Sequence, residues 1–89
     1  MIAVLDASVA VEIALDGPHA ESFRRVVKEA TAVFSPDLMA AEVANALWKY
    51  QRYEKLEVDV CFHALQSALE LPTKFIPNHE LATEALSMS

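Results

Sequence analysis

The chain has 89 residues, a hydrophobic fraction of 54% and one glycine, a composition that fits one compact domain and excludes an intrinsically disordered protein. Seven basic and thirteen acidic residues give a net charge of −6, so the chain does not have the basic composition of a general nucleic-acid binder. One cysteine, no signal-peptide pattern and no apolar run near the roughly 20 residues that span a bilayer predict a cytoplasmic protein without membrane contact.

The first third of the chain predicts one strand and two helices. Residues 2 to 5 form a continuous apolar run, which is typical of a short strand buried on both faces. Residues 8 to 15 favour a helix capped by Ser8, although their alternating valines also fit a strand, and a turn follows at 16 to 18. The next helix has an apolar stripe at helical spacing, formed by Phe23, Val26, Val27 and Ala30.

The middle of the chain predicts a second strand at residues 32 to 34, followed by a long helix. Ser35 is placed to cap that helix and Pro36 to be its first residue, and the helix should run to about Tyr53. After a turn at 54 to 57, a fourth helix is indicated by an apolar stripe of Val58, Cys61, Phe62, Leu65 and Leu69.

The end of the chain predicts a third short strand at residues 74 to 76 and a last helix from His79. Strands that alternate with helices imply right-handed crossovers and a parallel sheet, which is an α/β fold class. The three histidines match no zinc-binding spacing, and Cys61 is predicted to be a core residue.

Two acidic residues interrupt this apolar pattern. Asp6 closes the first apolar run, and Glu42 lies within residues 39 to 48, which are otherwise nearly apolar. A lone buried carboxylate is unfavourable unless it is neutralised, paired or bound to a cation. Ligands of open α/β sheets bind beyond the carboxyl ends of the strands, where Asp6 lies and toward which Glu42 can point. The pattern therefore favours a divalent-metal site formed by Asp6 and Glu42. Two alternatives stay open: Asp6 ends the strand and caps the next helix, and Glu42 is an ordinary helix residue that faces water.

These motifs resemble the PIN domain family, most closely its VapC-type ribonuclease toxins. Residues 2 to 9 resemble the family's opening strand with its first acidic residue and following hydroxyl, and residues 35 to 47 resemble its second acidic motif. The resemblance covers the whole chain and implies a three-layer PIN-like fold, with a short parallel sheet flanked by helices in one domain over residues 1 to 89. It also implies a metal-dependent endoribonuclease that uses Mg²⁺ or Mn²⁺ held by three or four carboxylates.

The resemblance also implies roles for four residues. Asp6 and Glu42 match the first two acidic residues and would be catalytic metal ligands. Ser8 would orient the site through a hydrogen bond, and Asn45 would do the same or contact RNA. The family's third acidic residue has no match, so the chain resembles the N-terminal two-thirds of a PIN domain without its C-terminal strands. Weak metal binding and impaired cleavage are the expected consequences.

The implied partners are an RNA substrate and an antitoxin protein. A homodimer is also expected, because an unpaired edge on the first strand invites pairing with another chain. The aromatic residues Trp48, Tyr50 and Tyr53 either belong to the core or present a groove to a partner helix. Two alternatives to a nuclease stay open. One is a catalytically inactive PIN remnant that serves as a protein-binding or dimerisation module, and the other is a small α/β interaction module without nuclease ancestry.

Overall fold

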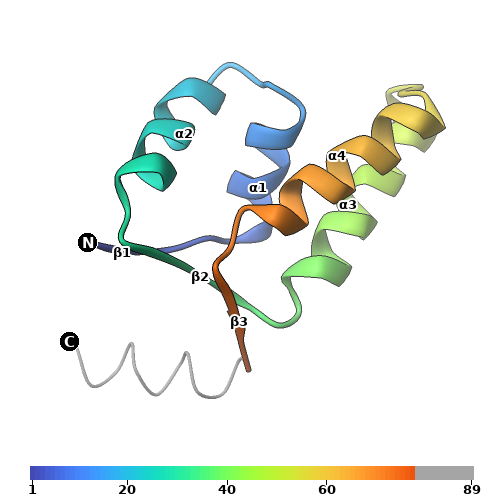
Figure 1. Ribbon diagram of the computed structural model, residues 1–89. Coiled ribbons are helices and arrows are strands. Elements are labelled where there is room, and N and C mark those ends of the chain that lie inside the picture. The colour runs from blue at the N-terminus through green and yellow to red at the C-terminus, as the bar shows by residue number, and fades with distance from the viewer. Residues whose placement is uncertain (78–89) are drawn as a thin grey trace.

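The computed structural model describes residues 1–77, which form three parallel strands and four helices (Figure 1). The predicted last helix from His79 lies outside the described residues. None of the described helices combines the length and the apolar character needed to cross a membrane. In chain order the elements are β1 (Ile2–Val4), α1 (Ala7–Ala14), α2 (Ala20–Glu29), β2 (Ala32–Pro36), α3 (Met39–Tyr53), α4 (Val58–Glu70) and β3 (Lys74–Ile76).

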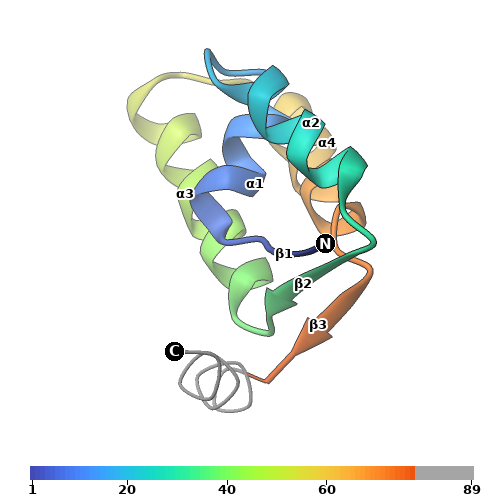
Figure 2. The ribbon, with the colours of Figure 1, turned by 90° about the vertical axis from the view of Figure 1, so that its left-hand side faces the viewer.

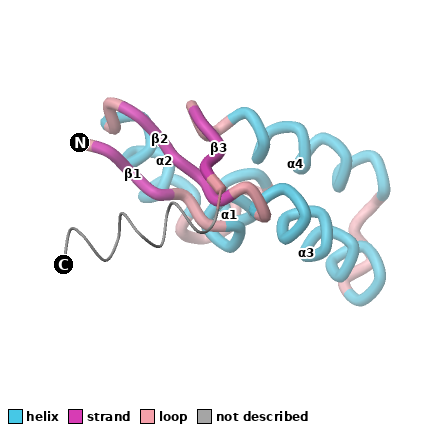
Figure 3. The backbone as a smooth tube through the Cα atoms, turned by 90° about the horizontal axis from the view of Figure 1, so that it is seen from below, coloured by secondary structure: helices cyan, strands magenta, loops and turns pink. Residues whose placement is uncertain are grey.

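The predicted parallel sheet is confirmed, with β2 between β1 and β3. Figure 3 shows the strands side by side with the described helices behind them. Side chains alternate between the two faces of a strand, so Val33 and Ser35 of β2 face the helices and are buried. Ile2 and Val4 of β1 are each 62% exposed. The prediction that β1 is buried on both faces was therefore wrong, because the described helices cover only one face.

The boundary between β2 and α3 differs from the prediction. Ser35 and Pro36 are the last residues of β2, and α3 begins only at Met39, with Leu38 as an N-cap that makes no side-chain capping bond. The Ser-Pro pair fits a helix start equally well in sequence, but Ser35 is fully buried and its hydroxyl bonds to the neighbouring strand. The predicted end of α3 at Tyr53 is confirmed.

The core lies between the helices, with α1 in contact with α2, α3 and α4 (Figure 2). Small side chains allow these helices to approach closely. Ala10 of α1 and Ala68 of α4, for example, have no exposed surface. The apolar stripes were predicted only in part, because Val26 and Phe62 are exposed. The buried core residues on the helices are Ala10, Val11, Ile13, Ala20, Met39, Val43, Leu47, Cys61, Ala64 and Ala68.

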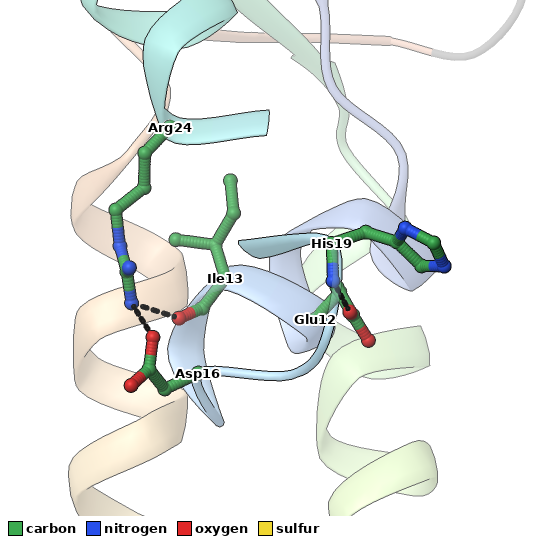
Figure 4. A network of polar contacts seen from close by, with 5 residues as sticks. All are labelled: Glu12, Ile13, Asp16, His19 and Arg24. Atoms are coloured by element: carbon green, nitrogen blue, oxygen red, sulfur yellow. Dashed lines mark hydrogen bonds and ion pairs between the residues drawn. The ribbon is translucent and has the colours of Figure 1, made fainter. Parts of the chain in front are cut away.

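A polar network closes the turn between α1 and α2 (Figure 4). Glu12 Oε2 accepts a hydrogen bond of 2.6 Å from the backbone N–H of His19, the N-cap residue of α2. Arg24 Nη2 donates to the carbonyl oxygen of Ile13 at 3.0 Å and pairs with Asp16 Oδ1 at 2.8 Å. The carboxylate of Glu12 therefore provides a hydrogen-bond partner for a backbone N–H at the start of α2, and the guanidinium of Arg24 provides one for a carbonyl oxygen at the end of α1.

The helices α3 and α4 form a hairpin that extends away from the sheet (Figure 1). Its turn contains Lys55 in the left-handed region, with φ of 58°. Inside the hairpin the Sγ–H of Cys61 donates to the carbonyl oxygen of Leu47 at 3.6 Å. The predicted burial of Cys61 is thus confirmed.

Candidate functional site at the carboxyl ends of the strands

Asp6 lies between β1 and α1 and acts as the N-cap of α1. Its Oδ1 accepts hydrogen bonds from the backbone N–H of Val9 at 3.0 Å and from the hydroxyl of Ser8 at 2.8 Å. Both bonds use Oδ1, and Oδ2 accepts none from residues 1–77. The capping contacts hold the carboxylate of this exposed residue through Oδ1 and leave Oδ2 without a hydrogen-bond partner in residues 1–77.

The backbone that carries Asp6 is held by β2. The N–H of Leu5 donates to the carbonyl oxygen of Phe34 at 2.8 Å, and the carbonyl oxygen of Leu5 accepts from Ser35 Oγ at 2.9 Å. Because Leu5 and Ser35 are buried, these bonds are shielded from water. The position of Asp6 is therefore set by the end of the sheet.

Glu42 lies in the first turn of α3, which follows the carboxyl end of β2. The buried stripe of this helix consists of Met39, Val43 and Leu47, so the side chain of Glu42 falls outside it and is exposed. Asn45 is also exposed and lies three residues further on, a spacing that puts it beside Glu42 on the helix surface.

Asp6 and Glu42 lie at the same end of the sheet. The strands β1 and β2 are parallel neighbours, so the residues that follow them emerge at the same edge, and α1 and α3 contact each other. The premise that both carboxylates are buried was wrong, because each lies on the solvent side of its element. In the range 1–77 no group of three or more His, Cys, Asp or Glu side chains is placed to hold a metal ion.

A third carboxylate, that of Asp37, also follows a strand at this end. Its backbone N–H donates to the carbonyl oxygen of Ile76 at 2.9 Å, and the residue is exposed. Sequence reasoning did not single it out, because residues 35 to 38 were assigned to a helix start. The rule that ligands gather beyond the carboxyl ends of parallel strands would have identified it once β2 was extended to Pro36.

The other polar and aromatic candidates lie outside this edge of the sheet. Arg24 and Arg25 of the basic cluster on α2 are engaged with Asp16 and Glu21, at 2.8 Å and 3.9 Å respectively. Trp48 is 51% exposed, so it is a surface residue and not part of the core. The site that the structure offers is therefore an exposed acidic edge, without a basic surface formed by the cluster on α2.

Comparison with known proteins identifies the family. A search of curated proteins finds no match. The family model for the PIN domain matches residues 3–88, which is nearly the whole chain. PIN domains are generally nucleases and generally use divalent metals. The family match and the small parallel sheet with its four described helices agree: the chain belongs to the PIN domain family.

Proposed function

We propose that this PIN domain is a metal-dependent endoribonuclease of the toxin–antitoxin type, similar to VapC toxins. The observation that carries the proposal is the pair of exposed carboxylates, Asp6 and Glu42, at one end of the parallel sheet of a PIN domain. Water and substrate have free access to carboxylates in this position. Two carboxylates repel an RNA phosphate, so a cation between them and the phosphate would make the contact favourable.

The carboxylate oxygens of Asp6 and Glu42 are the type of ligand that a hard divalent cation prefers. Asp6 Oδ2 and the Glu42 carboxylate would hold Mg²⁺ or Mn²⁺, which prefer oxygen ligands and keep several waters. A bound metal ion activates water and stabilises charge on the phosphorus oxygens. Two carboxylates are fewer than the three or four implied by the resemblance, and we therefore propose weak metal binding and slow cleavage.

Two neighbours of the carboxylates have supporting roles in this proposal. The hydroxyl of Ser8 donates to Asp6 Oδ1 and so restrains the carboxylate while Oδ2 stays available to a metal ion. Asn45, one turn after Glu42, would donate its amide N–H groups to a phosphate or base of the RNA. An antitoxin protein that covers this edge would block both the metal and the substrate.

The direct test is cleavage of fluorescent RNA by the purified full chain. We expect slow cleavage with Mg²⁺ or Mn²⁺, none after chelation with EDTA, and none with Asp6→Asn or Glu42→Gln. Glu70→Gln is the matched control, because it removes the same kind of charge from an exposed residue at the end of α4, before β3 begins. Metal-dependent cleavage that survives in both site variants would overturn the assignment of the site.

A second candidate is a catalytically inactive PIN remnant that acts as a binding module. It is supported by the absence of a three-residue metal group within residues 1–77 and by the many exposed apolar side chains on the hairpin of α3 and α4. Calorimetry with Mg²⁺ and Mn²⁺ separates the two candidates. Binding that is lost in Glu42→Gln favours the nuclease, and no binding in the wild-type chain favours the remnant.

A further inference from the structure

The solvent-exposed face of α3 carries a line of polar side chains that begins at the proposed site. Its members follow one another at spacings of three or four residues, which places them on the same face of the helix. This polar stripe consists of Glu42, Asn45, Lys49 and Arg52, and all four residues are exposed. At a rise of about 1.5 Å per residue, Lys49 and Arg52 lie about 10 Å and about 15 Å along α3 from Glu42. The polar stripe therefore leads from the proposed metal site toward the far end of the helix.

The charge along the polar stripe changes from negative to positive. Residues 43–53 include Lys49 and Arg52 and no acidic residue. The next acidic residue, Glu54, comes only at the C-cap of α3. The two ion pairs within residues 1–77 both involve α2, so Lys49 and Arg52 belong to neither. On a chain with a net charge of −6, this face is a local region of positive charge that adjoins the proposed metal site.

Arg52, at the far end of the polar stripe, is held by two aromatic rings. Its Cζ lies 5.4 Å from the ring centroid of Trp48 and 5.9 Å from that of Tyr53, within the range of cation–π contacts. Trp48 and Tyr53 are 51% and 69% exposed, and Arg52 is exposed as well, so these contacts leave the guanidinium accessible to solvent. An arginine that its neighbours already restrain loses less conformational freedom when it binds a phosphate. The exposed rings can also stack on nucleobases.

The arrangement favours RNA over an acidic peptide. An RNA with one phosphate at the proposed metal site carries further phosphates along its backbone, and Lys49 and Arg52 are the next cations along α3. The aromatic rings beside Arg52 add a stacking surface for bases, which acidic side chains do not use. The polar stripe therefore fits an RNA strand that leaves the site along α3.

We propose that Lys49 and Arg52 are positioning residues that bind phosphates of the RNA on one side of the cleavage point. The inference rests on the proposed function, which supplies RNA as the ligand. Lys49 offers a point charge to one phosphate, and Arg52 offers its planar guanidinium to another about one turn further along α3. Neither residue touches the reacting phosphate. Both raise the affinity for RNA and direct the path of the strand away from the site.

The test is the binding of single-stranded oligouridine by the full chain in EDTA, so that metal-dependent cleavage does not consume the RNA. Binding is followed by the anisotropy of a fluorescent label on the RNA and by the emission of Trp48, the single tryptophan, which base stacking should quench. We expect the logarithm of the affinity to fall with the logarithm of the salt concentration at a slope of about −1.4, because each of two phosphate contacts on a single strand contributes about −0.7. Lys49→Gln and Arg52→Gln should each flatten the slope by about 0.7, and the double variant should lose binding.

Two control variants separate a local contact from the effect of net charge. Lys28→Gln removes the same charge from an exposed residue of α2 and should leave the slope unchanged. Arg52→Lys keeps a positive charge at the same position and should keep the slope of the wild type. All of these variants replace exposed side chains, so circular dichroism should show an unchanged fold.

Three results would overturn the inference. The first is no binding by the wild-type chain, and the second is equal flattening of the slope in Lys28→Gln and Lys49→Gln. The third is binding of oligoglutamate with the same affinity and the same change in the emission of Trp48, which would assign the polar stripe to an acidic protein segment. RNA that binds through Lys49 and Arg52 but is not cleaved with Mg²⁺ or Mn²⁺ in a second assay would support the positioning role and contradict the proposed nuclease.

Discussion

The hydroxyl of Ser35 donates a hydrogen bond of 2.9 Å to the carbonyl oxygen of Leu5. This side-chain bond supplements the backbone bond from Leu5 to Phe34 at the point where β1 ends. The next residue, Asp6, starts α1, so a buried serine on the central strand holds the position of a carboxylate in the proposed site. The consequences can be measured one residue at a time.

Replacement of the buried hydroxyl should destabilise the fold. We expect Ser35→Ala to lower the free energy of unfolding by about 1–3 kcal/mol, because the carbonyl oxygen of Leu5 loses a partner in a buried position. Urea denaturation followed by circular dichroism provides the value. The matched control is Ser67→Ala on the exposed surface of α4, which should stay within about 0.5 kcal/mol of wild type. Equal effects in both variants would contradict a structural role for the bond.

The capping role of Asp6 can be separated from its proposed metal role. Asparagine caps helices as well as aspartate does, so Asp6→Asn should keep the stability of the wild type, whereas Asp6→Ala should lose about 0.5–2 kcal/mol. Both substitutions should abolish metal binding and RNA cleavage. Thermal unfolding and calorimetry on the same preparations distinguish the two roles. Full metal affinity in Asp6→Asn would show that the residue only caps α1.

The bond from Ser8 to Asp6 should tune the affinity for metal. Ser8→Ala removes the donor that fixes Oδ1, and we expect the affinity for Mg²⁺ or Mn²⁺ to fall about 10-fold. Isothermal titration calorimetry measures this without any assay of activity. Ser67→Ala again serves as the control, because it removes a hydroxyl from α4 outside the proposed site. An unchanged affinity in Ser8→Ala would remove Ser8 from the site.

In the turn between α1 and α2, the effect of Gly17→Ala on the free energy of unfolding should change sign when Glu12 is removed. A Cβ on Gly17 would clash with the carboxylate of Glu12, which would have to leave the N–H of His19. We therefore expect Gly17→Ala to destabilise the wild-type chain by about 1 kcal/mol. In a Glu12→Ala background the clash is absent. Gly17→Ala should then stabilise the fold by about 0.4–1 kcal/mol, because alanine lowers the conformational entropy of the unfolded chain. Additive effects would contradict this coupling.

Local pattern was sufficient to predict much of the fold. The apolar run before Asp6 predicted β1, the helical stripe after Glu57 predicted α4, and the short segment at 74 to 76 predicted β3. These elements are set by the periodicity of neighbouring residues, which a sequence shows directly. The parallel direction of the strands followed from their alternation with helices, whereas their order in the sheet was not predicted.

The errors occurred where contacts between distant residues decide the outcome. The sequence does not show that Leu5 offers a carbonyl oxygen to Ser35, so Ser35 was assigned to a helix cap. The sequence also does not show which face of β1 the helices cover, so Val4 was predicted to be buried. For the same reason Glu42, surrounded in sequence by apolar residues, was predicted to be buried although it lies outside the buried stripe of α3. Its role in metal binding stays a prediction.

The thiol of Cys61 donates to the carbonyl oxygen of Leu47 between α3 and α4, so its reactivity can report separation of the two helices. Only 9% of Cys61 is exposed, so a thiol-reactive reagent reacts slowly with the native chain and faster when the two helices separate. Because the chain has a single cysteine, the rate of labelling reports the accessibility of this one site. Alkylation of the native chain therefore measures local opening of the hairpin of α3 and α4.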